Sequence, residues 1–585
     1  MLTMSLRIPT ILLVLIVFTF AGAARSFAQS QSDENTPRTG AINGRVLNDT
    51  GQPVPNALVF ATGQGAATQR TAMADEAGNF VISGLDASLY FIGASAPAHA
   101  TMVREPGEIP SPYRIGDSVT LNLVRGGVIT GTVTTATGEP LVQAVVRATL
   151  IRDANGKIST TMRFPLERTT DDRGVYRIYG LTAGTYVVSA GGRIASFSAG
   201  PYDADAPTYA PSSTRDTAAE VDVKAGQETS GIDIRYRSEP GRSISGTVTG
   251  QPAPNALTSV TLSQVVNGVS QLVSFSYQSP NGKGFVFYGL PDGEYDVTAQ
   301  AFAAQSGIQA TEPLHVSIKG RDVTGLNLVL TASPSLAGRV VLIASTAVEC
   351  QNKRKPLFAE TLVLARRSDK SAQKNVLTFP NLSTNQTSPD KNGDFAFRSL
   401  APGQYALGTR FFARYWYLRS IERESPAPTT TGRPAVVGSG NDLARSGFQA
   451  KFGDRITKVT MTLAEGAASL RGALKSEPNS APPTLSVHLV PAEKENAEDL
   501  LRFFVSPVQA DGTFSLTNIP PGNYWVLPRT GESMTDEKLR SPDEAEARLK
   551  IRREAEGAKV QLELKPCQNL VDYSLVFKNS TSKNP

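Results

Sequence analysis

Histidine and cysteine, which often carry catalysis and bind transition metals, are scarce in this sequence. Its 585 residues include three histidines, two cysteines and two tryptophans. A zinc peptidase needs a histidine with a glutamate three residues further on. The residues at that spacing after His99, His315 and His488 are Met102, Ile318 and Pro491. We therefore assign no catalytic residue, no metal ligand and no cofactor, and we predict that the protein is not an enzyme.

A strong excess of one charge is also missing. The formal net charge is +5, and Arg7 and Arg25 in the first 28 residues contribute two of these charges, so the rest of the chain carries +3. Proteins that bind nucleic acid through their overall field need a far more basic balance. Nucleic acid is therefore not an expected partner.

A long apolar run opens the chain. Residues 8–20 follow the positive charge of Arg7 and precede small residues that end in Ser26-Phe27-Ala28, which is the order of a secretory signal peptide. The run is short for a membrane span. We predict a signal peptide over residues 1–28 that is cleaved after Ala28, with an uncleaved anchor as the alternative. The mature chain would have no membrane span and would be secreted, periplasmic or otherwise part of the cell envelope.

The rest of the sequence is rich in glycine and proline and contains one motif five times. The second copy reads GVYRIYGLTAGTYVV, in which aromatic and apolar residues alternate before a Gly-Leu pair, another glycine and a tyrosine. Such alternation predicts strands. We interpret the motif as a hairpin whose tyrosine, Tyr186 here, packs inward and bonds a backbone group at the corner. The aromatic residue and the tyrosine of each copy are Phe80 and Tyr90, Tyr176 and Tyr186, Phe285 and Tyr295, Phe395 and Tyr405, and Phe514 and Tyr524.

Each copy has an earlier strand before it and an alternating strand after it, so each copy predicts a small β-sandwich. A repeat of about a hundred residues implies five domains. We predict an all-β chain of five tandem sandwiches arranged as a bent string. The domains are 39–124, 125–238, 239–332, 333–466 with an insertion, and 467–567 with one helix, followed by a tail at 568–585.

The repeated pattern, V-x-G-x-V, then a turn and proline, then G-x-F-x-[IF]-x-x-L-x-x-G-x-Y, resembles the carboxypeptidase regulatory-like domain. The resemblance is clearest over residues 40–98, 126–190 and 242–300. It implies a transthyretin-like or carbohydrate-binding-like sandwich related to the immunoglobulin architecture, in an array similar to those of secreted bacterial proteins. The family is an accessory domain beside a peptidase, so the resemblance implies a fold and no activity.

The fifth copy contains the segment SPDEAEARLKIRREAEG. Ser541, Pro542 and Glu544 have the order of a helix start and Gly557 that of a stop. We predict one short helix near the C-terminus in an otherwise β chain.

The acidic turn DKNGD, residues 390–394, allows a calcium hypothesis. Asp390 and Asn392 are spaced as at the opening of a calcium loop, but the twelfth position holds Ala401 in place of a bidentate glutamate. The alternative is an ordinary Asn-Gly turn.

The two cysteines invite a disulfide in an exported chain. Cys350 lies in the insertion of the fourth copy and Cys567 follows the fifth copy's late strand. They can pair only if these two domains pack closely; two free thiols are the alternative.

An aromatic run in the fourth copy is the candidate carbohydrate-binding site. If the segment is a strand, Tyr415 and Tyr417 point to one face, and Trp416 points to the other with Arg414 beside it. Sugar rings stack on aromatic faces, so Trp416 is the favoured platform, while a packed core strand is the alternative.

Two functions remain open. The first is an exported, non-catalytic, multi-domain binding or scaffold protein, with polysaccharide, peptidoglycan or another envelope protein as its partner. The second is an accessory or regulatory subunit of an exported peptidase or glycosidase.

Overall fold

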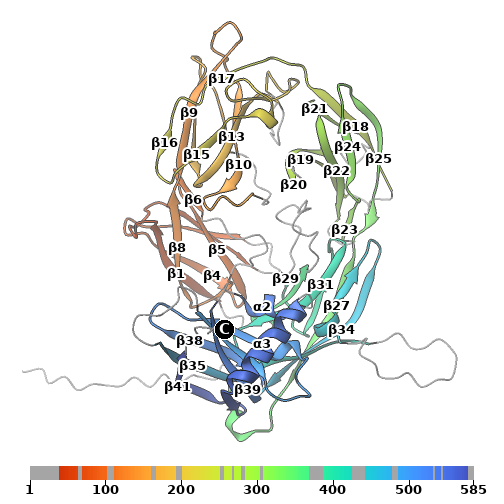
Figure 1. Ribbon diagram of the computed structural model, residues 1–585. Coiled ribbons are helices and arrows are strands. Elements are labelled where there is room, and N and C mark those ends of the chain that lie inside the picture. Colours follow the sequence, from red (N-terminus) through yellow and green to blue (C-terminus); the bar gives the residue numbers. More distant parts are fainter. Residues whose placement is uncertain are drawn as a thin grey trace, which may run out of the picture. The chain divides into compact units, whose positions relative to one another are not determined.

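The computed structural model describes residues 39–577 except 64–68, 102–110, 160–165, 193–199, 251–255, 267–268, 279–283, 304–306, 368–385, 425–441, 477–484, 531–533 and 542–543 (Figure 1). The predicted signal peptide lies outside these residues. The described strands form ten sheets, two for each of five sandwiches, so the predicted fold class is confirmed. None of the described helices is both long and apolar enough to cross a membrane.

Domain 1 consists of two four-stranded sheets, β4-β1-β8-β6 and β3-β2-β5-β7. Its strands are β1 (Thr39–Asn48), β2 (Leu58–Gly63), β3 (Gln69–Met73), β4 (Asn79–Asp86), β5 (Leu89–Ser95), β6 (His99–Thr101), β7 (Tyr113–Arg114) and β8 (Ser118–Arg125).

Domain 2 repeats this plan with sheets β12-β9-β16 and β11-β10-β13-β14, to which β17 and β15 add. Its elements are β9 (Gly127–Thr134), β10 (Val145–Asp153), β11 (Leu166–Thr169), β12 (Val175–Leu181), β13 (Gly184–Ala190), β14 (Thr208–Tyr209), η1 (Arg215–Thr217), β15 (Glu220–Val223), β16 (Glu228–Thr229) and β17 (Ile234–Arg235).

Domain 3 has a three-stranded sheet, β21-β18-β25, and a larger one, β20-β19-β22-β23-β26, in which β24 also pairs with β22. Its strands are β18 (Arg242–Thr249), β19 (Leu257–Val266), β20 (Val269–Gln278), β21 (Gly284–Leu290), β22 (Gly293–Ala303), β23 (Gly307–Ala310), β24 (Leu314–Ile318), β25 (Val323–Val329) and β26 (Thr331–Ala332).

Domain 4 has sheets β30-β27-β34-β32 and β29-β28-β31-β33. Its elements are β27 (Ser335–Ile343), η2 (Val348–Cys350), η3 (Phe358–Glu360), β28 (Thr361–Arg367), β29 (Gln386–Thr387), β30 (Asp394–Phe397), β31 (Gly403–Phe411), β32 (Trp416–Arg423), α1 (Leu443–Ser446), β33 (Phe448–Ala450) and β34 (Arg455–Glu465).

Domain 5 has sheets β38-β35-β41 and β37-β36-β39-β40, with helices on the second sheet. Its elements are β35 (Ala468–Ser476), β36 (Leu485–Pro491), η6 (Leu500–Arg502), β37 (Phe504–Pro507), β38 (Thr513–Ile519), β39 (Gly522–Thr530), α2 (Asp536–Leu539), α3 (Ala545–Ala558), β40 (Gln561–Leu564) and β41 (Asn569–Phe577).

The repeated motif places a glycine directly opposite an aromatic ring in all five domains. The cross-strand pairs are Gly44 with Phe80, Gly131 with Tyr176, Gly246 with Phe285, Gly338 with Phe395, and Gly472 with Phe514. A Cβ at Gly44 would lie 2.8 Å from the Phe80 ring and 2.0 Å from the carbonyl oxygen of Val119. The glycine is therefore required by close packing on both sides, which explains why it recurs with the aromatic residue.

The motif tyrosine bonds to the backbone as expected. In every domain its hydroxyl donates to the carbonyl oxygen four residues earlier, at 2.8–3.0 Å, and the ring is buried. The hairpin interpretation is wrong in one respect. The two motif strands, such as β12 and β13, belong to different sheets, so the glycine-containing turn carries the chain across the sandwich.

Two predictions for domain 5 also need correction. The helix is present as α3, but its N-cap is Glu544 without a side-chain capping bond, and it runs past Gly557 to Ala558, with Lys559 as the C-cap. The predicted tail begins too early, because residues 569–577 form β41, parallel to β35. The late strand that precedes Cys567 is β40, and it belongs to the other sheet.

Candidate functional site

The aromatic run of domain 4 does not form the predicted platform. Arg414 and Tyr415 lie in a turn, and the strand begins only at Trp416, so the alternation expected for a continuous strand is reset. The Trp416 side chain is 1% exposed and belongs to the domain core. The prediction that Trp416 stacks on sugar is therefore wrong. Arg414 is exposed, and Tyr415 and Tyr417 are half-buried.

The acidic turn at 390–394 is explained without calcium. The Asp390 carboxylate accepts hydrogen bonds from the backbone N–H groups of Asn392 and Asp394, at 2.8 and 3.0 Å. Asp75 and Asp171 make the same turn in domains 1 and 2. Among the described residues there is no group of three histidine, cysteine, aspartate or glutamate side chains arranged to hold a metal ion.

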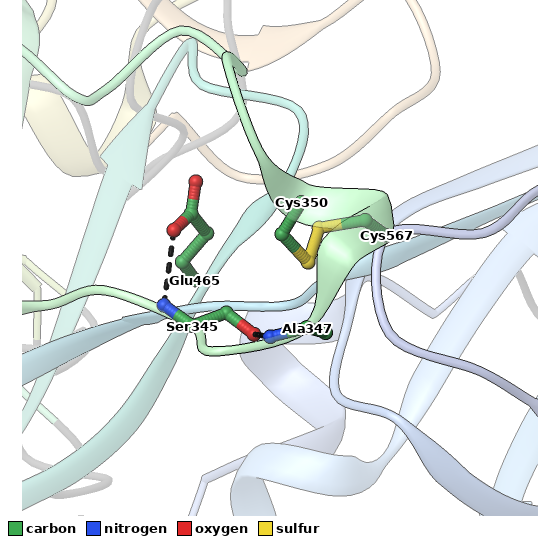
Figure 2. Close-up of a disulfide and its surroundings, with 5 residues drawn as sticks. All are labelled: Ser345, Ala347, Cys350, Glu465 and Cys567. Carbon is green, nitrogen blue, oxygen red and sulfur yellow. Dashed lines mark hydrogen bonds between the residues drawn. A yellow bond between two sulfur atoms is a disulfide. The ribbon is translucent and has the colours of Figure 1, made fainter.

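The two cysteines are bonded across the junction of domains 4 and 5 (Figure 2). Their Cα atoms are 5.3 Å apart although 217 residues separate them in sequence. Cys350 ends η2 in the insertion of domain 4, and Cys567 lies between β40 and β41. Figure 2 also shows the Glu465 carboxylate, which accepts a hydrogen bond from the backbone N–H of Ser345 at 3.0 Å and so holds the segment that leads to Cys350.

Asn518 is a second link across this junction. Its side-chain Nδ2 donates to the backbone oxygens of Ala413 and Trp416, at 2.8 and 2.7 Å. The Tyr415 carbonyl oxygen accepts in turn from the N–H groups of Gly466 and Ala467, at 2.8 and 2.9 Å. The backbone carbonyl groups of the aromatic run thus form the hydrogen-bonding contact with domain 5. The residue types of the run do not indicate this role.

Asn518→Gly should weaken this junction by about 1–3 kcal/mol, because two hydrogen bonds are lost. Asn518 has a φ of +57°, which glycine adopts freely, so the substitution removes the bonds without straining the backbone. The matched control is Asn56→Gly, at an exposed asparagine with a φ of +56° in domain 1. Urea unfolding should show a loss for the first variant that clearly exceeds that for the second; equal losses would rule out a junction role.

Domains 1 and 4 also contact each other, although two domains separate them in sequence. Leu89 of β5 packs with Leu362 and Leu364 of β28 in one buried cluster. Beside it, the Arg114 guanidinium lies 4.4 Å from the centre of the Phe412 ring and 3.8 Å from the Glu360 carboxylate. The outer faces of one sheet from each domain therefore pack against each other through apolar side chains.

The outer face of the corresponding sheet in domain 5 is covered by helices. Val490, Phe503, Val505 and Leu527 of the sheet side pack against Leu539 of α2 and Ile551 and Ala555 of α3. His488, on the same face of β36 as Val490, is 2% exposed. Its Nε2 is 3.0 Å from the Ser486 hydroxyl, and its Nδ1 has no partner among the described residues.

Acid should destabilise domain 5 through His488. Burial, with a smaller contribution from Arg529, lowers the pKa of His488 from 6.5 to about 4. Between pH 6.5 and 4 the His488 side chain is protonated in the unfolded chain but neutral in the folded one. The free energy of unfolding is therefore unaffected above pH 6.5 and falls as the pH drops toward 4. We expect a loss of about 2 kcal/mol at pH 5. His488→Gln should remove most of this loss in hydrogen exchange of β36 and α3, whereas His99→Gln in domain 1 should leave it unchanged.

The corresponding sheet of domain 3 carries a row of buried polar residues on its outer face instead. Ser259, Thr261 and Ser263 form a row on β19, and the hydroxyls of Ser259 and Ser263 and the Oε1 atom of Gln300 on β22 have no partner among the described residues. Phe275 and Tyr277 on β20 flank the row, with ring centres 5.3 Å apart, and Tyr277 is 49% exposed. Ser259, Thr261 and Ser263 are at most 5% exposed, so the ring of Tyr277 is the part of this face that a ligand can reach. Sequence reasoning missed this face because β19 resembles any buried strand.

One comparison with known proteins, a family model, agrees with the fold of domain 1. Residues 41–122 match the family model of the carboxypeptidase regulatory-like domain. No curated protein matches the chain in sequence. Among solved structures, a streptococcal ancillary pilin is 10% identical, with 50% of this chain and 99% of the pilin aligned at a TM-score of 0.17.

Two other solved structures align over more of the chain. The Bacillus anthracis TIE protein is 11% identical over 74% of this chain and 76% of its own, with a TM-score of 0.14. The RrgB pilus protein of Streptococcus pneumoniae is 8% identical over 70% of this chain and 91% of its own, with a TM-score of 0.13. TM-scores this low add nothing about either fold or function. The family match covers nearly all of domain 1, and the other domains repeat its motif and strand plan. This chain is therefore built from tandem sandwiches, of which the first matches the family model of the carboxypeptidase regulatory-like domain over residues 41–122.

Proposed function

We propose that this protein is an exported, non-catalytic scaffold of the cell envelope. The observation that carries the proposal is the junction of domains 4 and 5, where a disulfide and the Asn518 bonds hold two sandwiches together. Disulfides persist in oxidising compartments outside the cytosol. The disulfide and the hydrogen bonds hold the two domains in a fixed arrangement. A scaffold needs such an arrangement, because it presents binding surfaces at defined positions.

The alternative function is an accessory or regulatory subunit of an exported hydrolase. The family of domain 1 includes domains beside peptidases, which keeps this alternative open. The two functions differ in what copurifies with the protein. A scaffold would be isolated from envelope extracts with no hydrolase activity toward peptides or glycans, and the purified chain alone would have none; stoichiometric recovery of a peptidase or glycosidase would favour the alternative.

A neutral polysaccharide that stacks on the exposed ring of Tyr277 is the ligand class that we propose for domain 3. Tyr277 lies opposite Ser259 at the border of the buried hydroxyl row and offers a ring that is 49% exposed, on which a sugar can stack. Glycan-array binding of the mature protein and of its Tyr277→Ala variant tests this assignment. Binding that disappears in the variant while the melting temperature is unchanged supports it, and equal binding by both proteins contradicts it.

A further inference from the structure

The last described strand, β41, has one backbone edge that no described strand pairs with. β41 pairs with β35 on one side, and no described strand pairs with its other side. Such an edge is a template for another strand. Figure 1 shows β41 as the outer member of the sheet β38-β35-β41.

The equivalent edge is covered in two other domains. In domain 1, β6 lies antiparallel to β8, and in domain 4, β32 lies antiparallel to β34 along most of its length. The register identifies the matching residues, because Gly338 faces Val459 in domain 4 and Gly472 faces Tyr573 in domain 5. Tyr573, Leu575 and Phe577 therefore correspond to Val459, Met461 and Leu463.

The burial of these residues differs between domains 4 and 5. Val459, Met461 and Leu463 lie in the core of domain 4, with β32 beside their strand, and each is no more than 1% exposed. In β41 only Leu575 is buried, whereas Tyr573 and Phe577 remain half-buried. An added strand would remove this apolar surface from water.

The order of elements along the chain explains why domain 5 has no strand beside the outer edge of β41. After β31, domain 4 continues into β32, which covers β34. After β39, domain 5 continues instead into α2 and α3, and these helices pack on the other sheet. The segment that could have supplied the strand is therefore used elsewhere.

Residues 573–577, Tyr-Ser-Leu-Val-Phe, carry no charge, although charged side chains commonly prevent pairing at a strand edge.

The sequence of β41 is also complementary to that of a second, antiparallel β41. If two β41 strands lie antiparallel with their Leu575 residues opposite each other, Tyr573 faces Phe577 of the second copy and Ser574 faces Val576. Each inward position then meets an apolar residue, as Ile421 meets Met461 and Leu418 meets Leu463 in domain 4.

We propose that the β41 edge binds the β41 edge of a second copy, forming a two-fold symmetric dimer with one continuous six-stranded sheet. A shared patch on both copies is the ordinary form of such a dimer. The proposal is independent of the scaffold function, because an enzyme subunit could dimerise in the same way.

Light scattering after size exclusion of the mature chain tests the dimer. Val576 is 57% exposed and faces away from the core, so Val576→Lys should leave the fold intact, while its charge next to the dyad should raise the dimer dissociation constant at least ~10-fold. The matched control is Val571→Lys, a valine of the same strand that is 50% exposed and precedes the irregular residue Asp572 (φ +60°), outside the paired run.

The expected result is a concentration-dependent dimer for the parent and for Val571→Lys, with dimerisation slowing hydrogen exchange at 573–577, and a weakened dimer for Val576→Lys. A parent that stays monomeric at its highest soluble concentration overturns the proposal. A dimer that both lysine variants retain unchanged, without protection at 573–577, also overturns it by placing the interface elsewhere.

Discussion

Trp416→Ala should destabilise the protein by about 3–5 kcal/mol, the usual cost of truncating a buried tryptophan to alanine. The indole is enclosed in the core of domain 4 with residues such as Phe397, Leu400 and Met461, so its removal leaves a large cavity. The backbone oxygen of Trp416 also receives the Asn518 bond, so loosening of β32 should spread to the junction with domain 5.

The matched control for Trp416 is Tyr417→Ala, at the next position of the same strand, where the side chain is only half-buried. Urea unfolding should show a clearly smaller loss for Tyr417→Ala. A Trp416→Ala protein with parental stability but without the parent's binding to cell-wall polysaccharide would restore the platform and contradict the buried position.

Removing the Cys350–Cys567 disulfide should cost about 2–5 kcal/mol, the range for native bridges. The bridge closes a loop between residues 217 apart, and long loops give the larger stabilisation in the chain-entropy account, because the unfolded chain gains the most freedom. The double variant Cys350→Ser with Cys567→Ser removes the bridge without leaving a reactive thiol.

The single variant Cys350→Ser is the control for this experiment, since it also lacks the bridge and should lose about as much stability. The parent treated with a reductant should match both. Hydrogen exchange should locate the loss at η2, the 566–568 turn and the neighbouring strands of domains 4 and 5. A double variant as stable as the oxidised parent would mean that the bridge contributes nothing to the junction.

The repeated core was predictable from sequence because local and cross-strand requirements coincide there. The glycine opposite each aromatic ring and the tyrosine at each corner recur in all five domains. The number of sandwiches and the hydrogen bonds of the corner tyrosines could therefore be inferred from the sequence. The sheet membership of the motif strands could not, since a tight turn within a sheet and one between sheets need the same glycines.

The candidate site was less predictable because it depends on contacts between domains. The outward direction assigned to Trp416 failed because a two-residue turn at 414–415 changes which face the next residue occupies. Whether Cys350 and Cys567 meet depends on how domains 4 and 5 pack, which no local pattern encodes. Asn518 carries no signal in its residue type, and its role follows only from the carbonyl groups that domain 4 turns toward it.

Peptide mapping without reduction, on protein expressed from Met1 and recovered outside the cytoplasm, tests the exported scaffold most directly. The account predicts a mature N-terminus at Gln29 and one cross-linked peptide pair that joins the segment around Cys350 to the segment around Cys567. Protein retained in the cytoplasm with its first 28 residues and two free thiols would contradict it.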